Sequence, residues 1–174
     1  GRPEVLKVLQ SQDMLPAITF IFSRAGCDGA LYQCLRSRMV LTSQEEAQQI
    51  KDIVDAGVEG IPEEDLQVLD FKRWREALSR GFAAHHAGML PAFRHIVEDL
   101  FVRGLVRAVF ATETLALGIN MPARTVVLEK LIKFNGEAHV DLTAGQYTQL
   151  TGRAGRRGID TLGNAVVQWA PAMD

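Results

Sequence analysis

The stretch AVFATETLALGINMPARTVV, residues Ala108–Val127, decides the fold, because it joins two apolar runs through a polar turn. The first run, Val106–Phe110, has the character of a buried strand, and it leads directly into Thr112 and its polar neighbours Glu113 and Thr114. Ligands of open parallel sheets bind at the carboxyl ends of the strands, where these hydroxyl and backbone N–H groups would lie. An ordinary connection between strands is the alternative, and the length and glycine–asparagine content of the turn favour a binding loop.

The rest of the chain alternates similar apolar runs with helical stretches. Further strands are predicted at Ala17–Phe22, Phe82–His85, Thr125–Leu128 and Ala165–Trp169. Helices are predicted at Asp28–Arg36, at Pro91–Val102 and from about Thr143 through the arginine-rich segment that follows. This alternation predicts an α/β fold with a largely parallel sheet that helices cover on both faces.

Residues 42–80 are predicted to form a helical insertion between two strands of this sheet. Ser43 and Glu46 have the spacing of a capping box, which begins one helix. Pro62 lies near the first turn of a second helix, and Phe71–Arg80 is amphipathic. The chain as a whole, residues 1–174, is expected to be one domain.

Composition agrees with a single soluble domain and excludes several function classes. The 174 residues are 47% hydrophobic, enough to bury a core without disulfides. Cys27 and Cys34 fit no CxxC pattern and are expected to be buried free thiols, and the four histidines do not form a ligand set, so no metal site is predicted. No apolar run approaches the ~20 residues that span a bilayer, so we expect no membrane partner and a cytoplasmic location.

Charge limits how this chain could bind nucleic acid. Its 19 basic and 21 acidic residues nearly balance, and the isoelectric point is near 6.1. A nucleic acid would therefore be held by local basic groups and backbone amides, since the chain has no global positive field. This balance counts against a free-standing nucleic-acid binder but not against one half of a cleft.

Polar residues follow three of the predicted strands. Ser23 and Arg24 follow the first strand, His86 to Gly88 follow the Phe82–His85 strand, and Thr112 follows the strand that ends near Phe110. Turns that follow parallel strands meet at one edge of the sheet. A row of hydroxyl, guanidinium and N–H donors there suits the phosphates of a nucleic-acid strand. Each residue alone could instead be a turn cap or a satisfied core residue; we prefer that alternative for His85 and leave His86 open.

The segment QLTGRAGRRG, Gln149–Gly158, sets Arg153 and Arg156 three residues apart among small residues. At helical spacing both guanidiniums share a face and can clamp a phosphoryl group during its transfer, the role of arginine fingers. The alternative is a solvated basic helix end that Gly158 terminates. The segment alone does not decide between them.

Together these segments resemble superfamily 2 helicases. Residues 108–127 and the segment QLTGRAGRRG are similar to motifs V and VI of that superfamily in order and approximate spacing, and ITFIFSRAGCD, Ile18–Asp28, is similar to motif IV. A segment at Ala83–Phe101, AAHHAGMLPAFRHIVEDLF, resembles the HHAG element of the Ski-type (DExH) branch. The amino-acid sequence of these segments is most similar to that of bacterial HelY-type helicases. The resemblance covers nearly the whole chain and implies one second RecA-like domain, a three-layer sandwich.

The resemblance also implies roles for particular residues. Gln149, Arg153 and Arg156 would face ATP that a first RecA-like domain holds with Mg²⁺, and Gly118 and Asn120 would lie beside the nucleotide. Related helicases with an acidic residue at the place of Asn120 use a carboxylate there, whereas the amide both donates and accepts. Arg157 lies beyond the matched pair. The implied activity is that of an ATP-dependent RNA or DNA helicase that grips a single strand.

Two motifs that a complete motor needs are absent from these 174 residues. The sequence has no GxxxxGK[ST] phosphate loop and no DExH-like magnesium site. We therefore expect a domain from a longer helicase that is monomeric and inactive towards ATP by itself. The alternatives are a non-enzymatic nucleic-acid-binding module, which should show a basic surface or an aromatic platform, and a dinucleotide enzyme, which should carry GxGxxG where GCDG stands.

Overall fold

A computed structural model of the chain describes residues 1–112, 121–130 and 164–169. Its elements follow in the order α1 (Arg2–Ser11), β1 (Ala17–Phe20), α2 (Arg24–Arg36), α3 (Gln44–Gly57), α4 (Glu63–Leu69), α5 (Phe71–Ser79), β2 (Phe82–His85), α6 (Pro91–Val102), β3 (Ala108–Ala111), β4 (Thr125–Lys130) and β5 (Asn164–Trp169). The predicted strands are all present, with ends that differ by one or two residues. Helix α1 is an addition to the prediction, and the helix predicted between Thr143 and Gly158 lies outside the described residues.

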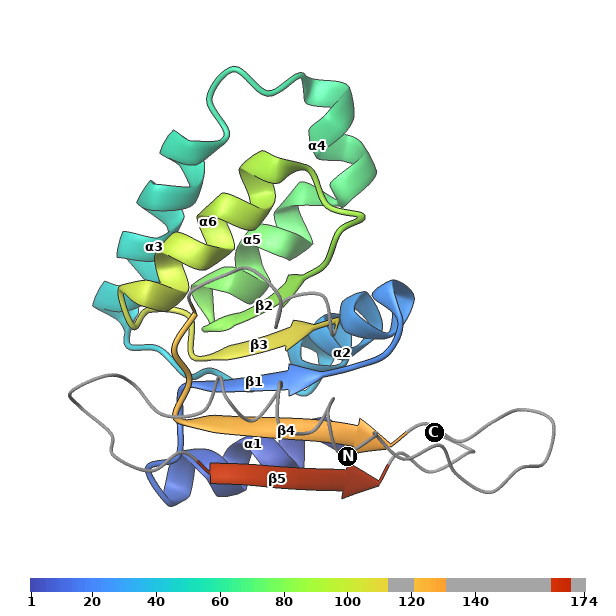
Figure 1. The fold of residues 1–174 in the computed structure, drawn as a ribbon. Helices are drawn as coiled ribbons and strands as arrows, with labels where there is room; N and C mark the ends of the chain where they lie inside the picture. Colours follow the sequence, from blue (N-terminus) through green and yellow to red (C-terminus); the bar gives the residue numbers. More distant parts are fainter. Residues whose placement is uncertain (113–120, 131–163, 170–174) are drawn as a thin grey trace, which may run out of the picture.

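The five described strands form one sheet in the order β2-β3-β1-β4-β5, and every neighbouring pair is parallel (Figure 1). Phe20 of β1 is level with Ala111 of β3, and Ala111 is level with His85 of β2. All strands therefore end at the same edge of the sheet. The four residues of β1, β2 and β3 are buried throughout, as expected for strands of a parallel sheet that helices cover.

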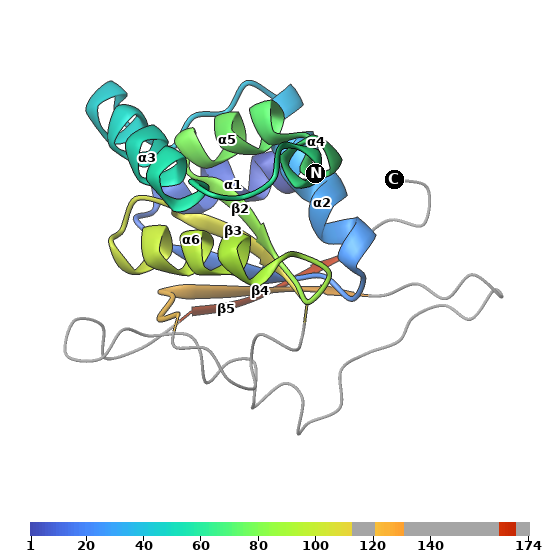
Figure 2. The ribbon, with the colours of Figure 1, turned by 90° about the horizontal axis from the view of Figure 1, so that it is seen from above.

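Helices cover both faces of the sheet. Helix α2 leads from β1 to β2, and α6 leads back from β2 to β3, in the opposite direction across the sheet. Because crossovers between parallel strands are right-handed, these two helices lie on opposite faces. Figure 2 shows this arrangement, with α1 and α2 on one side of the strands and α6 on the other. The predicted α/β sandwich with its parallel sheet is confirmed.

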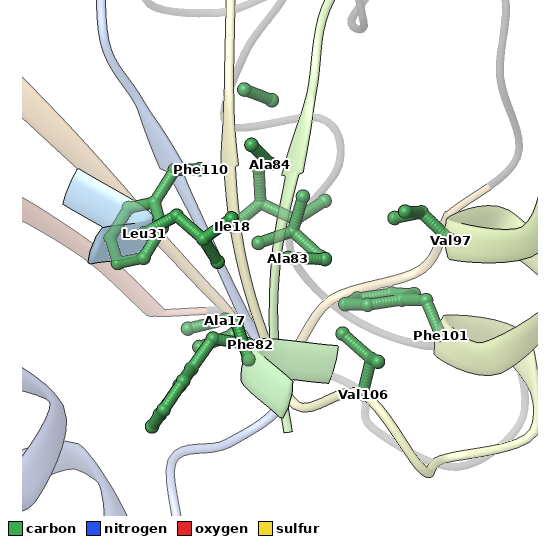
Figure 3. Close-up of a cluster of buried hydrophobic side chains, with 14 of the residues drawn as sticks. Ala17, Ile18, Leu31, Phe82, Ala83, Ala84, Val97, Phe101, Val106 and Phe110 are labelled. Carbon is green, nitrogen blue, oxygen red and sulfur yellow. The ribbon is translucent and has the colours of Figure 1, made fainter. Parts of the chain in front are cut away.

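The core lies between these layers. Figure 3 shows Leu31 of α2 on one side and Val97 and Phe101 of α6 on the other, with strand residues such as Ile18 between them, and all of these side chains are at most 2% exposed. Cys27 and Cys34 are buried free thiols, as predicted, and burial raises the pKa of each thiol to about 12. Among the described residues no helix has both the length and the apolar character needed to cross a membrane.

Helices α3, α4 and α5 occupy the region predicted as an insertion (Figure 1). Ser43 and Glu46 form the predicted capping box at the start of α3, and Arg107 donates to the same Glu46 carboxylate and to the carbonyl of Leu41. Trp74 of α5 packs against Phe93 of α6, with ring centroids 5.2 Å apart. These contacts fasten the helices to the sheet. The limits 42–80 of an insertion stay a prediction.

Candidate functional site

The register of the sheet brings three of the predicted turns to one edge. Ser23 and Arg24 lie three and four residues after the end of β1, His86 to Gly88 follow β2 directly, and Thr112 follows β3. Ser23, Arg24 and Gly88 are exposed and Thr112 is partly exposed. Segments up to about 90 residues apart in the chain thus form one polar row.

Ser23 begins α2. Its side-chain oxygen accepts a hydrogen bond of 2.9 Å from the N–H of Gly26, so Ser23 is the N-cap of the helix. The sequence predicted a helix only from Asp28, which was wrong, because the cap lets the helix begin four residues earlier. The positive end of the α2 dipole therefore points at the carboxyl edge of the sheet, where it favours an anion.

Arg24 is the first residue of α2, not part of a turn before it. Its side chain is exposed. Among the residues that the structure describes, its guanidinium has neither an ion pair nor a hydrogen bond, although Asp28 lies one helical turn further on. A cation without a carboxylate partner at a helix N-terminus is suited to a phosphate.

The paired histidines after β2 have different surroundings. His85 is the last residue of β2, and His86 is the first residue of the turn that follows it. His85 Nε2 lies 2.8 Å from Glu98 Oε2 on α6, while His86 Nε2 lies 3.0 Å from Asp28 Oδ1 on α2. Burial lowers the pKa of His85, and the hydrogen bond with Glu98 opposes this shift. His85 is therefore a core residue, only 3% exposed, whose ring has a hydrogen-bond partner, as predicted.

His86 is bonded through both of its ring nitrogens. The N–H of Gly88 donates to His86 Nδ1 over 3.1 Å. An acceptor at Nδ1 places the proton of the neutral ring on Nε2, which donates to Asp28 Oδ1. His86 thereby ties the turn after β2 to α2, which follows β1.

Gly88 contributes space at this edge. Its N–H donates to His86 Nδ1, and its contact with a nucleic acid stays a prediction. A Cβ at this position would lie 3.1 Å from His86 Nδ1 and 3.3 Å from Cδ of Arg24. The arginine stem and the imidazole therefore pack closely over this glycine. Any larger residue would displace one of them.

A pocket that sequence reasoning missed adjoins this edge. It has a volume of about 570 Å³ and lies between α2, α4, α5 and the turn after β2. Its walls are largely apolar, with Leu31, Val68, Leu69, Met89 and Phe93, and they include the Asp28–His86 pair. Asp28 was also missed. Its relation to His86 spans 58 residues and follows only from the order of the strands.

The residues predicted to face a nucleotide lie outside the described part of the chain. This holds for Gly118, Asn120, Gln149, Arg153 and Arg156. Their proximity to one another therefore stays a prediction from the sequence.

Comparison with known proteins identifies related chains over the whole sequence. The family described as "Helicase conserved C-terminal domain" matches residues 63–158. The "Probable helicase HelY" of Mycobacterium tuberculosis (strain ATCC 25618 / H37Rv) is 66% identical over all 174 residues, which make up 19% of that protein. "Antiviral helicase SKI2" of Saccharomyces cerevisiae is 35% identical over 95% of this chain and 13% of its own length.

The human "Superkiller complex protein 2" is 40% identical over 94% of this chain and 13% of its own length. The chain thus spans about a fifth or less of the length of these curated relatives.

Proposed function

Because the chain belongs to the family of helicase conserved C-terminal domains and is homologous to Ski2-type DExH helicases, we propose that it is the second RecA-like motor domain of an ATP-dependent helicase. In this proposal the domain has two tasks. It grips the backbone of a single RNA or DNA strand at the sheet edge, and it supplies arginine fingers to ATP that the first RecA-like domain holds. Among the described residues Arg24, at the start of α2, has no ion pair or hydrogen bond of its guanidinium, and this observation best supports the first task.

The grip would use the groups that the three turns bring together. Arg24 supplies a cation, and the hydroxyls of Ser23 and Thr112 supply polar contacts. Gly88 has no side chain, so the Arg24 stem lies close to it and a nucleic-acid strand could approach as well. None of these groups reads a base edge, so binding should depend on the phosphates and little on sequence.

The second task rests on Arg153 and Arg156. Two guanidiniums are a donor set that fits phosphoryl oxygens, and Gln149, Gly118 and Asn120 would lie beside the nucleotide. ATP with Mg²⁺ supplies the phosphoryl group to be transferred. The residues that hold it must come from another domain, because this sequence has no phosphate loop and no DExH segment. The arginines of this chain would stabilise negative charge that develops during transfer.

The test is to replace each arginine in the full-length protein. Arg153→Ala and Arg156→Ala should each lower kcat for ATP on the order of a thousandfold, with strand affinity and melting temperature largely kept. Lysine should rescue poorly because it lacks the planar fork. Arg157→Ala, one residue beyond the pair, is the matched control and should keep most of the turnover.

A basic helix end predicts different results. Both variants would then turn over ATP normally and lose only strand affinity. That outcome would refute the finger mechanism and favour the alternative of a non-enzymatic nucleic-acid-binding module.

A further inference from the structure

Arg24 and Asp28 lie one turn apart on α2 but do not pair. Opposite charges four residues apart on a helix are neighbours and commonly form an ion pair. Elsewhere in this chain pairs with this spacing do form: Arg103 contacts Asp99 at 3.0 Å, and Arg80 contacts Glu76 at 3.5 Å. In both of them the carboxylate precedes the arginine, which is the more favourable order, whereas Arg24 precedes Asp28. Asp28 instead contacts His86, at 3.0 Å. Among the described residues no carboxylate forms an ion pair with Arg24.

His86 is well placed to hold the Asp28 carboxylate. The imidazole is 7% exposed, whereas the Asp28 side chain is 51% exposed. The N–H of Gly88 fixes the ring through Nδ1, so Nε2–H points at Asp28. An oriented donor on a buried ring loses little side-chain entropy when it binds, unlike a long exposed arginine.

We propose that His86 withholds the Asp28 carboxylate from Arg24 and thereby keeps the Arg24 guanidinium available to a phosphate of the bound strand. His86 is then a positioning residue, which need not contact the strand itself. This inference rests on the proposed function in one respect, namely that Arg24 contacts the strand. It explains why the turn after β2 carries a histidine bonded at both nitrogens beside an exposed arginine.

Loss of His86 should therefore act through charge. Without the imidazole, Asp28 loses its donor, and Arg24 is the cation on the same helix face. Arg73 also lies near this region, but it is already paired with Asp70 and stacked over Tyr32, 4.2 Å from the ring centroid. An Arg24–Asp28 pair would compete with phosphate for the guanidinium.

The experiment measures binding of the full-length protein to fluorescein-labelled oligo(dT) and oligo(U) of roughly 20 nucleotides by anisotropy, over a series of salt concentrations. Arg24→Ala should weaken binding about tenfold and lower the salt slope by about one counterion. His86→Ala should weaken binding roughly three- to tenfold with the same change in slope. His86→Phe, which keeps the ring volume and loses both nitrogens, should match it and guards against a folding defect.

The decisive variant is the double replacement His86→Ala with Asp28→Asn. An amide cannot neutralise Arg24, so affinity and salt slope should return to within about twofold of the wild-type values. Asp99→Asn is the matched control. It removes the carboxylate beside Arg103 near the C-terminal end of α6, and it should leave nucleic-acid binding unchanged. Melting temperatures of all variants show whether each is folded.

The outcomes separate the two proposals. If Arg24→Ala binds normally, the strand contact of the proposed function is wrong. If Arg24→Ala is weak while either His86 variant binds normally, or the double replacement stays as weak as His86→Ala, the withholding role is overturned and the strand contact stands.

Discussion

The ion pair between Arg2 and Glu129 gives a stability prediction whose size follows from the structure. Arg2, at the start of α1, donates from Nε and Nη2 to both carboxylate oxygens of Glu129 on β4, at 2.7 and 2.9 Å. Its Nη1 donates to Gln33 Oε1 at 3.1 Å. The Glu129 side chain is only 7% exposed. Arg2→Ala would therefore leave a buried carboxylate without its cation.

Breaking a buried pair from one side costs about 3–5 kcal/mol of unfolding free energy. The Arg2 side chain is 27% exposed, so water can enter where it is removed, and we expect the lower end of this range, about 3 kcal/mol. In a chain of this size each kcal/mol moves the melting temperature by roughly 2–4 °C, so Arg2→Ala should melt about 6–12 °C lower.

Thermal and urea unfolding, followed by circular dichroism, measure this effect. Adding Glu129→Gln to Arg2→Ala removes the stranded charge and should restore part of the lost stability. Arg103→Ala breaks an exposed pair with Asp99 and should change stability by less than about 1 kcal/mol. If Arg2→Ala and Arg103→Ala melt within a degree of each other, the Arg2–Glu129 pair does not stabilise the fold and this reasoning is wrong.

Two further predictions are simpler to test. The hydrogen bonds from Arg107 and then from the backbone of Ser43 lower the pKa of Glu46 below its ordinary 4.5. The stability that Glu46 contributes is therefore present above that value and is lost as the pH falls through the lowered pKa, so Glu46→Gln should flatten the acid side of a stability–pH curve; an unchanged slope would contradict this. The purified 174-residue chain should release no phosphate from ATP above a buffer blank, because it has no phosphate loop. Phosphate release that stops when the chain is unfolded would contradict this prediction.

Local signals in the sequence were enough for most elements of the fold. The strands β1 to β5 are short apolar runs, and the capping box of Ser43 and Glu46 depends on residues three apart. Helix α1 was missed, and the start of α2 was placed at Asp28, because Ser23 could equally have belonged to a turn. Propensity alone does not decide between a helix cap and a turn, since the same hydroxyl serves both.

The site was less predictable because its contacts are between distant segments. His85 and His86 are identical neighbours in the sequence, and nothing local indicates that His85, the last residue of β2, and His86, the first residue after it, have different partners. Which helix covers each face follows from the strand order and the handedness of the crossovers. For the same reason the hydrogen bond from the N–H of Gly88 to His86 could not be predicted from the sequence.

The near balance of charge makes the pairing of each arginine matter for strand binding. A guanidinium held by a carboxylate contributes little to a phosphate contact, because the pair must first be broken. The described residues include carboxylate pairs of seven arginines, Arg2, Arg73, Arg75, Arg80, Arg103, Arg107 and Arg124. Arg24 is one of four described arginines without such a pair, together with Arg36, Arg38 and Arg94. It lies at the edge where a nucleic-acid strand would bind, and a buried imidazole holds the nearby Asp28 carboxylate. In a chain with a net charge of −2, local removal of a competing carboxylate can prepare a phosphate site where added positive charge is lacking.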